Sequence, residues 1–260
     1  MSKIVFASDF HLGMKGRYSS QEREAQVVNW IKEVAADADE VFLLGDIFDF
    51  WFEYSKVIPK GFVRIQNAIA NLTDAGIPVH MFIGNHDMWA FDYFTKELGM
   101  MMHRRPIEIE RQGRQLFIAH GDGLGPGEKT FKIIRKLFHS PVLIKMFQWL
   151  HPDIGIRIAH RWSSSSRASH GDIYQYKGPQ NEYLIHFAED YLLQKPEIDY
   201  FLFGHRHLVF DFMLSNGRSR YINTGDWLNF NSYAVMEQGQ IRLFTYNNEE
   251  LKVITNETHY

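Results

Sequence analysis

The chain of 260 residues has no cysteine, which excludes disulfides, zinc sites built on thiolates and iron–sulfur clusters. It also lacks any apolar run close to the ~20 residues of a membrane-spanning helix, so contact with a membrane would have to be peripheral. The first apolar stretch has only the length of a strand and follows Met1, Ser2 and Lys3. Because this is too short for the apolar core of a signal peptide, we expect a cytoplasmic protein.

The chain has little net charge, −3 in total, but the charge is unevenly distributed. Residues 124–177 contain nine basic and three acidic side chains, a net charge of +6 that leaves −9 for the rest of the chain. Such asymmetry indicates a distinct inserted segment that faces an anion. We therefore predict a core domain formed by residues 1–123 and 178–248, an inserted helical cap at 124–177 that covers the substrate, and a polar C-terminal tail at 249–260 that frays.

Five short apolar runs have the composition of buried strands. Each run ends at a residue whose side chain can bind a metal ion. In open α/β sheets, ligands collect beyond the carboxyl ends of the strands. One such run would carry little information, whereas five with converging ligands predict one site. The runs are Ile4–Asp9, Val41–Asp46, Val79–Asn85, Leu116–Asp122 and Tyr200–His205.

The spacing of apolar residues between these runs predicts the fold class. Residues 21–36 and 62–75 place apolar side chains at helical intervals, which predicts helices that connect parallel strands in βαβ units. From Leu208 onward the pattern alternates, with turn sequences at 215–217 and 237–240 that are typical of antiparallel hairpins. We therefore expect a mixed fold, α/β (α+β), in which parallel βαβ units are followed by antiparallel hairpins in the C-terminal part.

The chemistry of the site begins with two pairs of residues at a spacing of two. Side chains two apart on an extended chain point to the same side, so Asp9 with His11, and His205 with His207, can each bind one ion. Each pattern occurs often by chance when it stands alone. Mixed oxygen and imidazole ligands favour manganese, iron or zinc over calcium or magnesium, and the lack of thiolate favours manganese. The complete candidate set is Asp9, His11, Asp46, Asn85, His120, His205 and His207.

Five motifs of this chain, taken together and in order, resemble those of the calcineurin-like metallophosphoesterase family. They are D-x-H at Asp9, G-D-x-x-D at 45–49, G-N-H-D at 84–87, H-G-D at 120–122 and G-H-x-H at 204–207. The resemblance implies a four-layer αββα sandwich with a dinuclear metal centre at one sheet edge. It assigns Asp9, His11, Asp46 and His207 to the first ion, and Asp46, Asn85, His120 and His205 to the second.

This ligand set suits hydrolysis of a phosphoester. Two cations ~3.5–4 Å apart can lower the pKa of a shared water and hold the phosphoryl oxygens while that water attacks phosphorus. His86 resembles the family histidine that stabilises developing charge or protonates the leaving oxygen. Asp87 and Asp49 would orient His86 or the metal ligands, and an N-cap or loop hydrogen bond is the alternative for Asp49.

The inserted segment carries more apolar side chains than one face against the core requires. Phe131, Ile134 and Phe138 lie at helical spacing, and a second apolar set follows Pro141, which interrupts the run. One interpretation is a helical hairpin packed on the main domain. The other is a lid with an apolar groove and a cationic rim that suits an acylated phosphate ester.

From His120 onward the chain also resembles the UDP-2,3-diacylglucosamine pyrophosphohydrolases of lipid A synthesis. That resemblance rests on the order of Phe131, Arg135, His139–Pro141, Phe147, Arg157, Arg161 and Ser166. It implies a nucleotide–lipid substrate, cleaved to UMP and 2,3-diacylglucosamine 1-phosphate, and a peripheral position on the inner face of the cytoplasmic membrane. Members of that family commonly have tyrosine at the position of Phe131, and the best-known members have arginine at that of His86. The candidate substrate contacts are Phe131, Arg161, Ser166 and Arg167.

Three other functions remain open from the sequence. A soluble phosphodiesterase or nucleotide hydrolase acting on a non-lipid substrate would use the same metal centre, with the apolar cap merely packed. A nuclease is disfavoured because the overall acidity of the chain repels a phosphate backbone, so we expect no nucleic-acid partner. A metal-bound scaffold without activity would have to retain seven ligands that it does not use. The sequence does not set the oligomeric state.

Overall fold

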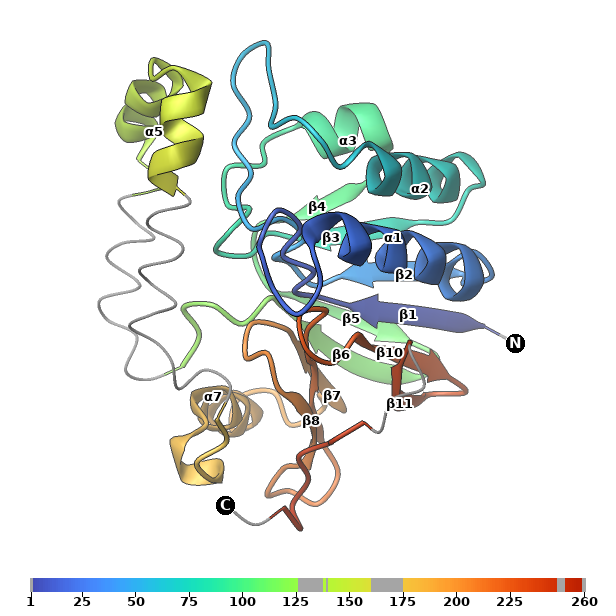
Figure 1. Cartoon of the computed structure of the whole chain (residues 1–260). Coiled ribbons are helices and arrows are strands. Elements are labelled where there is room, and N and C mark those ends of the chain that lie inside the picture. Colours follow the sequence, from blue (N-terminus) through green and yellow to red (C-terminus); the bar gives the residue numbers. More distant parts are fainter. Residues whose placement is uncertain (1, 126–137, 139, 160–174, 247–250, 259–260) are drawn as a thin grey trace.

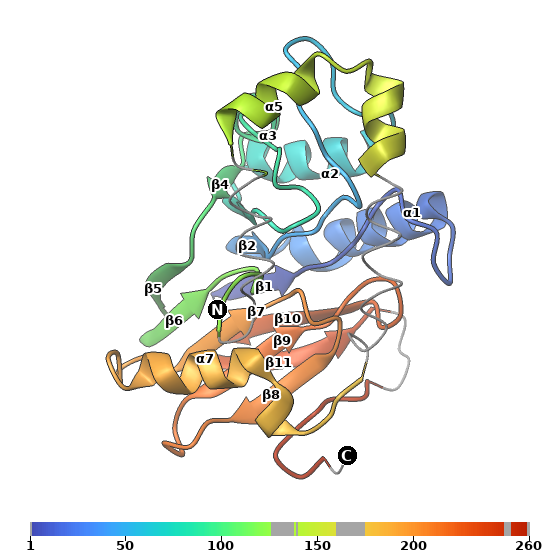
Figure 2. The same cartoon turned by 90° about the vertical axis from the view of Figure 1, so that its left-hand side faces the viewer.

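The computed structural model describes residues 2–125, 138, 140–159, 175–246 and 251–258. Two sheets lie face to face, and helices cover the outer face of each (Figures 1 and 2). This arrangement is the four-layer αββα sandwich expected from the motifs. Among the described residues no helix has the length and apolar character needed to cross a membrane.

The first sheet contains six strands in the order β11-β10-β1-β2-β3-β4. Strands β1 to β4 are parallel, as βαβ connections require, whereas β10 runs antiparallel to β1. Helices α1 and α2 follow β1 and β2 and lie together on the outer face (Figure 1). The strands are β1 Lys3–Ala7, β2 Glu40–Leu43, β3 Val79–Phe82, β4 Met101–His103, β10 Ser232–Glu237 and β11 Gln240–Thr245.

The second sheet contains five strands in the order β5-β6-β7-β9-β8. Its central strands β6, β7 and β9 are parallel, and β5 and β8 close the two edges in antiparallel pairs. Helix α7 covers its outer face (Figure 2). The strands are β5 Ile107–Arg111, β6 Arg114–Ile118, β7 Tyr200–Phe203, β8 Val209–Met213 and β9 Arg220–Thr224.

The helices begin and end where local chemistry favours it. Ser19 caps α1 in a reciprocal capping box, in which its hydroxyl accepts from the Glu22 amide at 3.2 Å and its own amide donates to the Glu22 carboxylate at 2.9 Å. Gly99 ends α3 in the left-handed conformation that glycine adopts easily. The helices are α1 Ser20–Trp30 with the π-helical turn Ile31–Ala35, α2 Val63–Asp74, α3 Tyr93–Leu98, α5 Pro141–Gln148, the 3₁₀ turn Pro179–Asn181 and α7 Tyr183–Leu192.

Three apolar layers hold the sandwich together. In β1 the alternation of a strand divides the side chains between two of them: Ile4 and Phe6 pack between the sheets, and Val5 and Ala7 pack under the helices. A third layer lies between the second sheet and α7. Strands buried on both faces explain why the five runs are almost continuously apolar. Because both sheets are fixed in this way, the loops that follow their strands meet at one edge.

The structure confirms the predicted strands, both βαβ helices and both C-terminal hairpins, and it changes the expectation for the tail. Residues 251–258 do not fray from the core. Ile254 is buried against the second sheet, and its backbone exchanges hydrogen bonds of 2.8 and 3.0 Å with Val209 and Asp211 of β8. The described part of the tail thus covers the open edge of β8.

The described residues of the inserted segment include α5 and a helix at 152–159. Phe147 of α5 packs against Phe50, Phe52 and Trp89, which lie in the loops after β2 and β3. The Trp89 indole also donates to the backbone oxygen of Phe138 at 2.9 Å. The first turn of α5 starts at Pro141, in agreement with the predicted interruption.

Candidate metal centre

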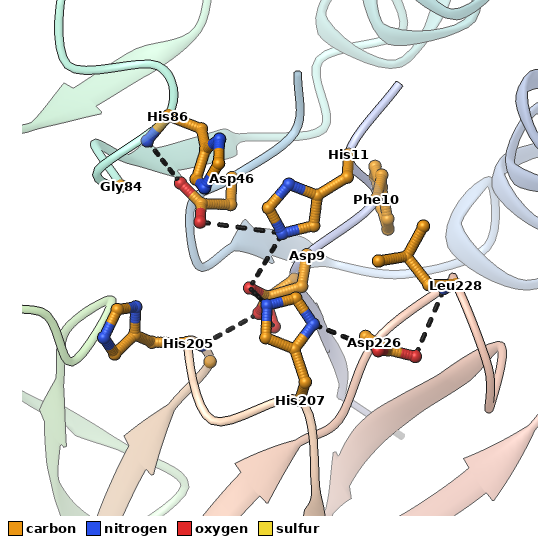
Figure 3. Close-up of polar contacts among 12 residues, drawn as sticks. Asp9, Phe10, His11, Asp46, Gly84, His86, His205, His207, Asp226 and Leu228 are labelled. Atoms are coloured by element: carbon orange, nitrogen blue, oxygen red, sulfur yellow. Dashed lines mark hydrogen bonds and ion pairs between the residues drawn. The ribbon is translucent and has the colours of Figure 1, made fainter. Parts of the chain in front are cut away.

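The loops after five strands bring the candidate ligands to one edge of the sandwich, and Figure 3 shows Asp9, His11, Asp46, His205 and His207 among them. Asp9 and His11 follow β1, and Asp46 follows β2. Asn85 follows β3, His120 follows β6, and the histidine pair follows β7. Nine non-glycine residues of the described chain have positive φ angles, and five of them are candidate ligands. Backbone strain of this kind gathers at functional sites, where the surrounding structure enforces it. The five are Asp9, His11, Asp46, His205 and His207.

The first cluster consists of Asp9, His11 and His207, whose ligand atoms lie within 4.8 Å of one another. Asp9 Oδ1 lies 3.6 Å from Nε2 of both His11 and His207. The other oxygen of Asp9 accepts from the His205 amide at 2.9 Å and from the Ser8 hydroxyl. One carboxylate oxygen is therefore held by the protein, and the other points at the two imidazoles.

The second cluster consists of Asp46, His120 and His205. Asp46 Oδ2 lies 3.4 Å from His120 Nε2, and Asn85 Oδ1 lies 3.3 Å from the same nitrogen. His120 Nδ1 donates to the backbone oxygen of Leu44 at 2.7 Å, which leaves Nε2 as the nitrogen with a free lone pair in the neutral ring. The amide of Asn85 thus joins the cluster that the sequence assigned to the second ion.

Asp46 lies between the two clusters. Its Oδ2 is 3.7 Å from His11 Nε2 in the first cluster, as well as 3.4 Å from His120 in the second. Close approach also constrains the neighbouring glycines: a Cβ on Gly45 would lie 2.6 Å from His120 Nδ1, and one on Gly84 would collide with the Asp46 carboxylate. The G-D and G-N pairs of the motifs therefore let two strand-end loops meet at the bridging position.

The residues present fit a pair of divalent cations. Asp9 Oδ1 and both ring nitrogens of His11 are buried and have no hydrogen-bond partner in the described part of the chain. Leaving such atoms unpaired is costly, and a cation would satisfy them. Separations of 3.4 to 3.7 Å are too long for hydrogen bonds, but they are close to the roughly 3.0–3.4 Å between two ligand atoms of one ion at about 2.1 Å from each.

Burial and the neighbouring charges together set the pKa values of the candidate ligands. Burial alone would raise the pKa of Asp9, but His207, His11 and His120 outweigh it and lower that pKa to about 2. Burial likewise opposes the charge of His120, yet Asp46 raises the pKa of His120 to about 10. For His205 burial dominates and lowers the pKa well below its usual value. The carboxylates are thus ionised, and a bound cation would displace the extra proton of His120, whereas His205 is already neutral.

His86 lies in contact with both His11 and Asp46. Its Nδ1 donates to the backbone oxygen of Asp49 at 2.9 Å and lies 3.5 Å from the Asp49 carboxylate. Burial opposes protonation, but Asp46 and Asp49 raise the pKa of His86 to about 9. The structure therefore places Asp49 where it orients His86 and favours its cationic form.

Asp87 lies where it supports the loops of the metal ligands, which is one of the two roles expected for it. It is fully buried, and its two oxygens accept from the amides of Gly84 at 2.7 Å and Ile47 at 2.9 Å. Burial and then Asp46 raise the pKa of Asp87 to about 7. In the structure Asp87 joins the loops after β2 and β3, so it fixes the backbone that carries Asp46 and Asn85.

Two residues that position the ligands were missed by the sequence reasoning. Asp226, after β9, accepts from His207 Nδ1 at 3.0 Å, an arrangement that commonly orients a metal-binding imidazole (Figure 3). Arg23 of α1 is fully buried and donates to the backbone oxygens of Phe10 and His11, both at 2.8 Å. An acidic residue after a strand in Thr224-Gly225-Asp226, and an arginine on an apolar helix face, were the available signals.

The four candidate substrate contacts Phe131, Arg161, Ser166 and Arg167 lie outside the described residues. The described part of the inserted segment shows an unusually apolar surface. No residue of α5 is buried, and Val142, Met146 and Trp149 are 67%, 63% and 86% exposed. Helix α5 itself lies on the side of the molecule toward which the strand β1 points (Figure 1).

An αββα sandwich that gathers carboxylates, imidazoles and an amide at the ends of its strands defines a metal-dependent hydrolase. The profile of the family described as calcineurin-like phosphoesterase matches residues 2–209. The chain belongs to the calcineurin-like phosphoesterase family, as its five motifs predicted, and divalent metal ions are the cofactors of that family.

Individual proteins resemble the chain over nearly its whole length. UDP-2,3-diacylglucosamine hydrolase of Porphyromonas gingivalis is 36% identical over 248 residues, which cover 91% of this chain and 94% of that protein. The protein of the same name from Aeromonas hydrophila is 26% identical and covers 92% of this chain and 96% of its own length. A solved phosphoesterase from E. coli is 15% identical, covers 96% of both chains and gives a TM-score of 0.47.

Proposed function

We propose that this protein hydrolyses the pyrophosphate bond of UDP-2,3-diacylglucosamine, giving UMP and 2,3-diacylglucosamine 1-phosphate. The observation that carries the proposal is the pair of ligand clusters joined by Asp46, in a chain that matches a hydrolase of that name over 91% of its length. A pyrophosphate suits the site because its oxygens bring the negative charge that two cations attract.

The residues around the phosphate have two roles, binding the metal ions and donating a proton. Asp9, His11, Asp46 and His207 would hold one ion, and Asp46, Asn85, His120 and His205 the other. Two such ions, when bound, activate a water and neutralise charge on the phosphoryl oxygens. His86 lies beside both clusters with its Nδ1 bonded to Asp49, so its Nε2 can donate to the oxygen that departs.

We assign manganese to the site because its ligands are oxygen and imidazole alone; iron and zinc are the alternatives. Asp9 and Asp46 contribute the two negative charges of the set, and the other ligands are neutral when bound. Two divalent ions therefore leave the centre with a net charge of about +2, which favours a pyrophosphate over an uncharged ester.

The inserted segment, residues 124–177, is the part that we assign to the lipid. Residues 1–123 and 178–248 form the core in this division, and the described part of the tail extends it along β8. The exposed apolar side chains of α5 share the helix with Lys145, and Arg157 lies in the helix that follows, a combination that favours an anionic membrane surface. We infer that the protein binds peripherally to the inner face of the cytoplasmic membrane, where such a substrate resides.

Hydrolysis of two matched substrates tests this proposal. Purified protein with manganese is incubated with UDP-2,3-diacylglucosamine and with the analogue that lacks both acyl chains, and release of UMP is measured. We expect efficient release from the lipid and much lower kcat/KM for the analogue. Equal turnover of the two would indicate a phosphodiesterase or nucleotide hydrolase with no use for the acyl chains, and release from neither would contradict the proposed reaction.

A further inference from the structure

A pocket of about 280 Å³, counted with its open mouth, lies beside the second ligand cluster. One wall comes from the first sheet, with His103 at the end of β4 and the turn Arg104–Pro106. The other wall comes from the second sheet, with His120 and Asp122. Because this volume includes open solvent, the pocket is small and admits a part of a substrate rather than all of it. Since His120 belongs to both the pocket and the second ligand cluster, the part of the substrate in the pocket would lie near the phosphate at the metal centre.

A chain of hydrogen bonds ends at this pocket. Arg111 donates to both oxygens of Glu40 at 2.6 and 2.8 Å, and His80 Nε2 lies 2.8 Å from Glu40 Oε1. His80 Nδ1 in turn lies 2.8 Å from His103 Nε2. Burial would raise the pKa of Glu40, but Arg111 and His80 lower it to about 2. Glu40 is therefore a carboxylate that can only accept hydrogen bonds.

The carboxylate sets the tautomer of both imidazoles when they are neutral. His80 must carry its hydrogen on Nε2 to donate to Glu40, so its Nδ1 accepts the hydrogen of His103 Nε2. His103 is then left with an unprotonated Nδ1. Burial lowers the pKa of His103 and favours this neutral form. Stacking on Phe82 at 4.8 Å and on His80 at 5.1 Å holds the ring in place.

The free nitrogen of His103 is open to a ligand. Nδ1 of His103 has no hydrogen-bond partner among the described residues. It is not a buried atom, so it is exposed to solvent. Arg105, at the rim, is exposed and has no partner among the described residues. Arg104 is held by the backbone oxygens of Ala90 and Phe91. The pocket thus offers one fixed acceptor beneath a cationic rim.

We propose that this pocket receives the uracil base of the substrate and that His103 Nδ1 accepts the hydrogen of uracil N3. The inference rests on the proposed function, because a uridine nucleotide forms one half of that substrate. Uracil presents a donor at N3 between two carbonyl acceptors, whereas cytosine presents an acceptor at N3 and a donor at N4. A fixed acceptor therefore selects uracil. Arg105 attracts the nucleotide phosphate and does not distinguish the bases.

Substitution of His103 tests the assignment against the matched substrates UDP-2,3-diacylglucosamine and its CDP analogue. The wild-type protein should prefer the UDP substrate by about tenfold in kcat/KM. His103→Phe keeps a stacked ring without an acceptor, so it should lower the UDP value by roughly five- to tenfold and leave the CDP value within about twofold. Arg105→Ala should lower both values alike, and His186→Phe, on the exposed face of α7, should change neither.

A second variant and a second measurement separate the possible failures. His80→Phe leaves His103 in place but removes the partner of its Nε2, so either nitrogen of His103 can carry the hydrogen. The variant should therefore show a weaker preference for uracil without losing hydrolysis. Calorimetric titration with UMP and CMP reports base selection without turnover. If the UDP-to-CDP ratio and the UMP-to-CMP affinity ratio of folded His103→Phe equal those of the wild type, the pocket assignment is wrong while the proposed function stands. If the wild type hydrolyses neither lipid, the proposed function fails, and selective, His103-dependent binding of UMP would still support the pocket.

Discussion

At the scale of single residues, the site depends on which atoms the protein leaves without a hydrogen-bond partner and which it ties down. One oxygen of Asp9 accepts hydrogen bonds from the His205 amide and the Ser8 hydroxyl, and the other, Oδ1, faces the imidazoles. Asp46 occupies the junction of the two clusters. Asp49 lies one step further out and acts through His86. These differences predict unequal effects of substitution.

Asp46→Ala should reduce kcat by roughly a thousandfold or more, because the joining carboxylate of both ions is lost. Asp49→Asn keeps the backbone oxygen that accepts from His86 and should cost about 10- to 100-fold. Metal content measured by mass spectrometry should fall for Asp46→Ala and stay near the wild-type value for Asp49→Asn. Similar residual rates and metal contents in the two variants would contradict the assignment of Asp46 as the bridge.

Asp226→Asn should weaken metal binding by about 10- to 100-fold, because His207 loses the carboxylate that orients it. The measurement is the dissociation constant for manganese, compared with that of Asp190→Asn on the exposed surface of α7. Asp226 also accepts from the amides of Leu228 and Asn229, so the melting temperature is measured in chelator as well. A loss of stability in chelator with unchanged metal affinity would show that Asp226 only supports its loop.

At the scale of elements, strand ends were predictable because a run of apolar residues closed by Gly-Asp or Gly-Asn is a local pattern, as in residues 41–46. The sheet that each C-terminal hairpin joins was not predictable. Strands β8 and β9 join the second sheet, whereas β10 and β11 join the first, beside β1. Local spacing carries no information about which sheet a hairpin completes. Asp226 was missed for this reason, since it nears His207 only because β9 pairs with β7.

The ion pair between β2 and β5 should make stability depend on pH in the acid range. The folded-state pKa of Glu40 is lowered to about 2, so its contribution is present above the unfolded value of about 4.5 and is lost as pH falls from 4.5 towards 2. Up to about 3 kcal/mol of the free energy of unfolding should disappear over this range. Urea titrations should show a smaller acid dependence for Glu40→Gln, and no such change for Glu237→Gln at an exposed position.

At the scale of the whole molecule, one sandwich of two sheets supports a candidate metal centre at its edge, and the exposed apolar helix α5 follows in the segment predicted to form a cap. The core was predictable because its motifs and periodicities are local. The cap at residues 124–177 was predicted from its charge and stays a prediction, as do the candidate contacts Phe131, Arg161, Ser166 and Arg167, which lie outside the described residues. The exposed face of α5 supports the interpretation of the cap as a lid that meets lipid.

Charging that face should release the protein from membranes. Val142→Glu combined with Trp149→Glu replaces two side chains that are 67% and 86% exposed, so the fold should be unaffected while apolar contact and attraction to anionic lipid are both lost. Co-sedimentation with phosphatidylglycerol vesicles should fall for this variant. Leu193→Glu, 85% exposed at the end of α7, is the matched control and should sediment as the wild type does. Equal sedimentation of all three proteins would argue against the cap as a membrane contact.

The most direct test of the central claim is a titration of the metal-free protein with manganese, with bound metal and release of UMP from UDP-2,3-diacylglucosamine followed together. The two clusters joined by Asp46 predict that hydrolysis is absent in chelator and reaches its maximum as the second ion binds to each chain. Full hydrolysis in chelator, or a maximum with a single ion bound per chain, would contradict the two-ion centre.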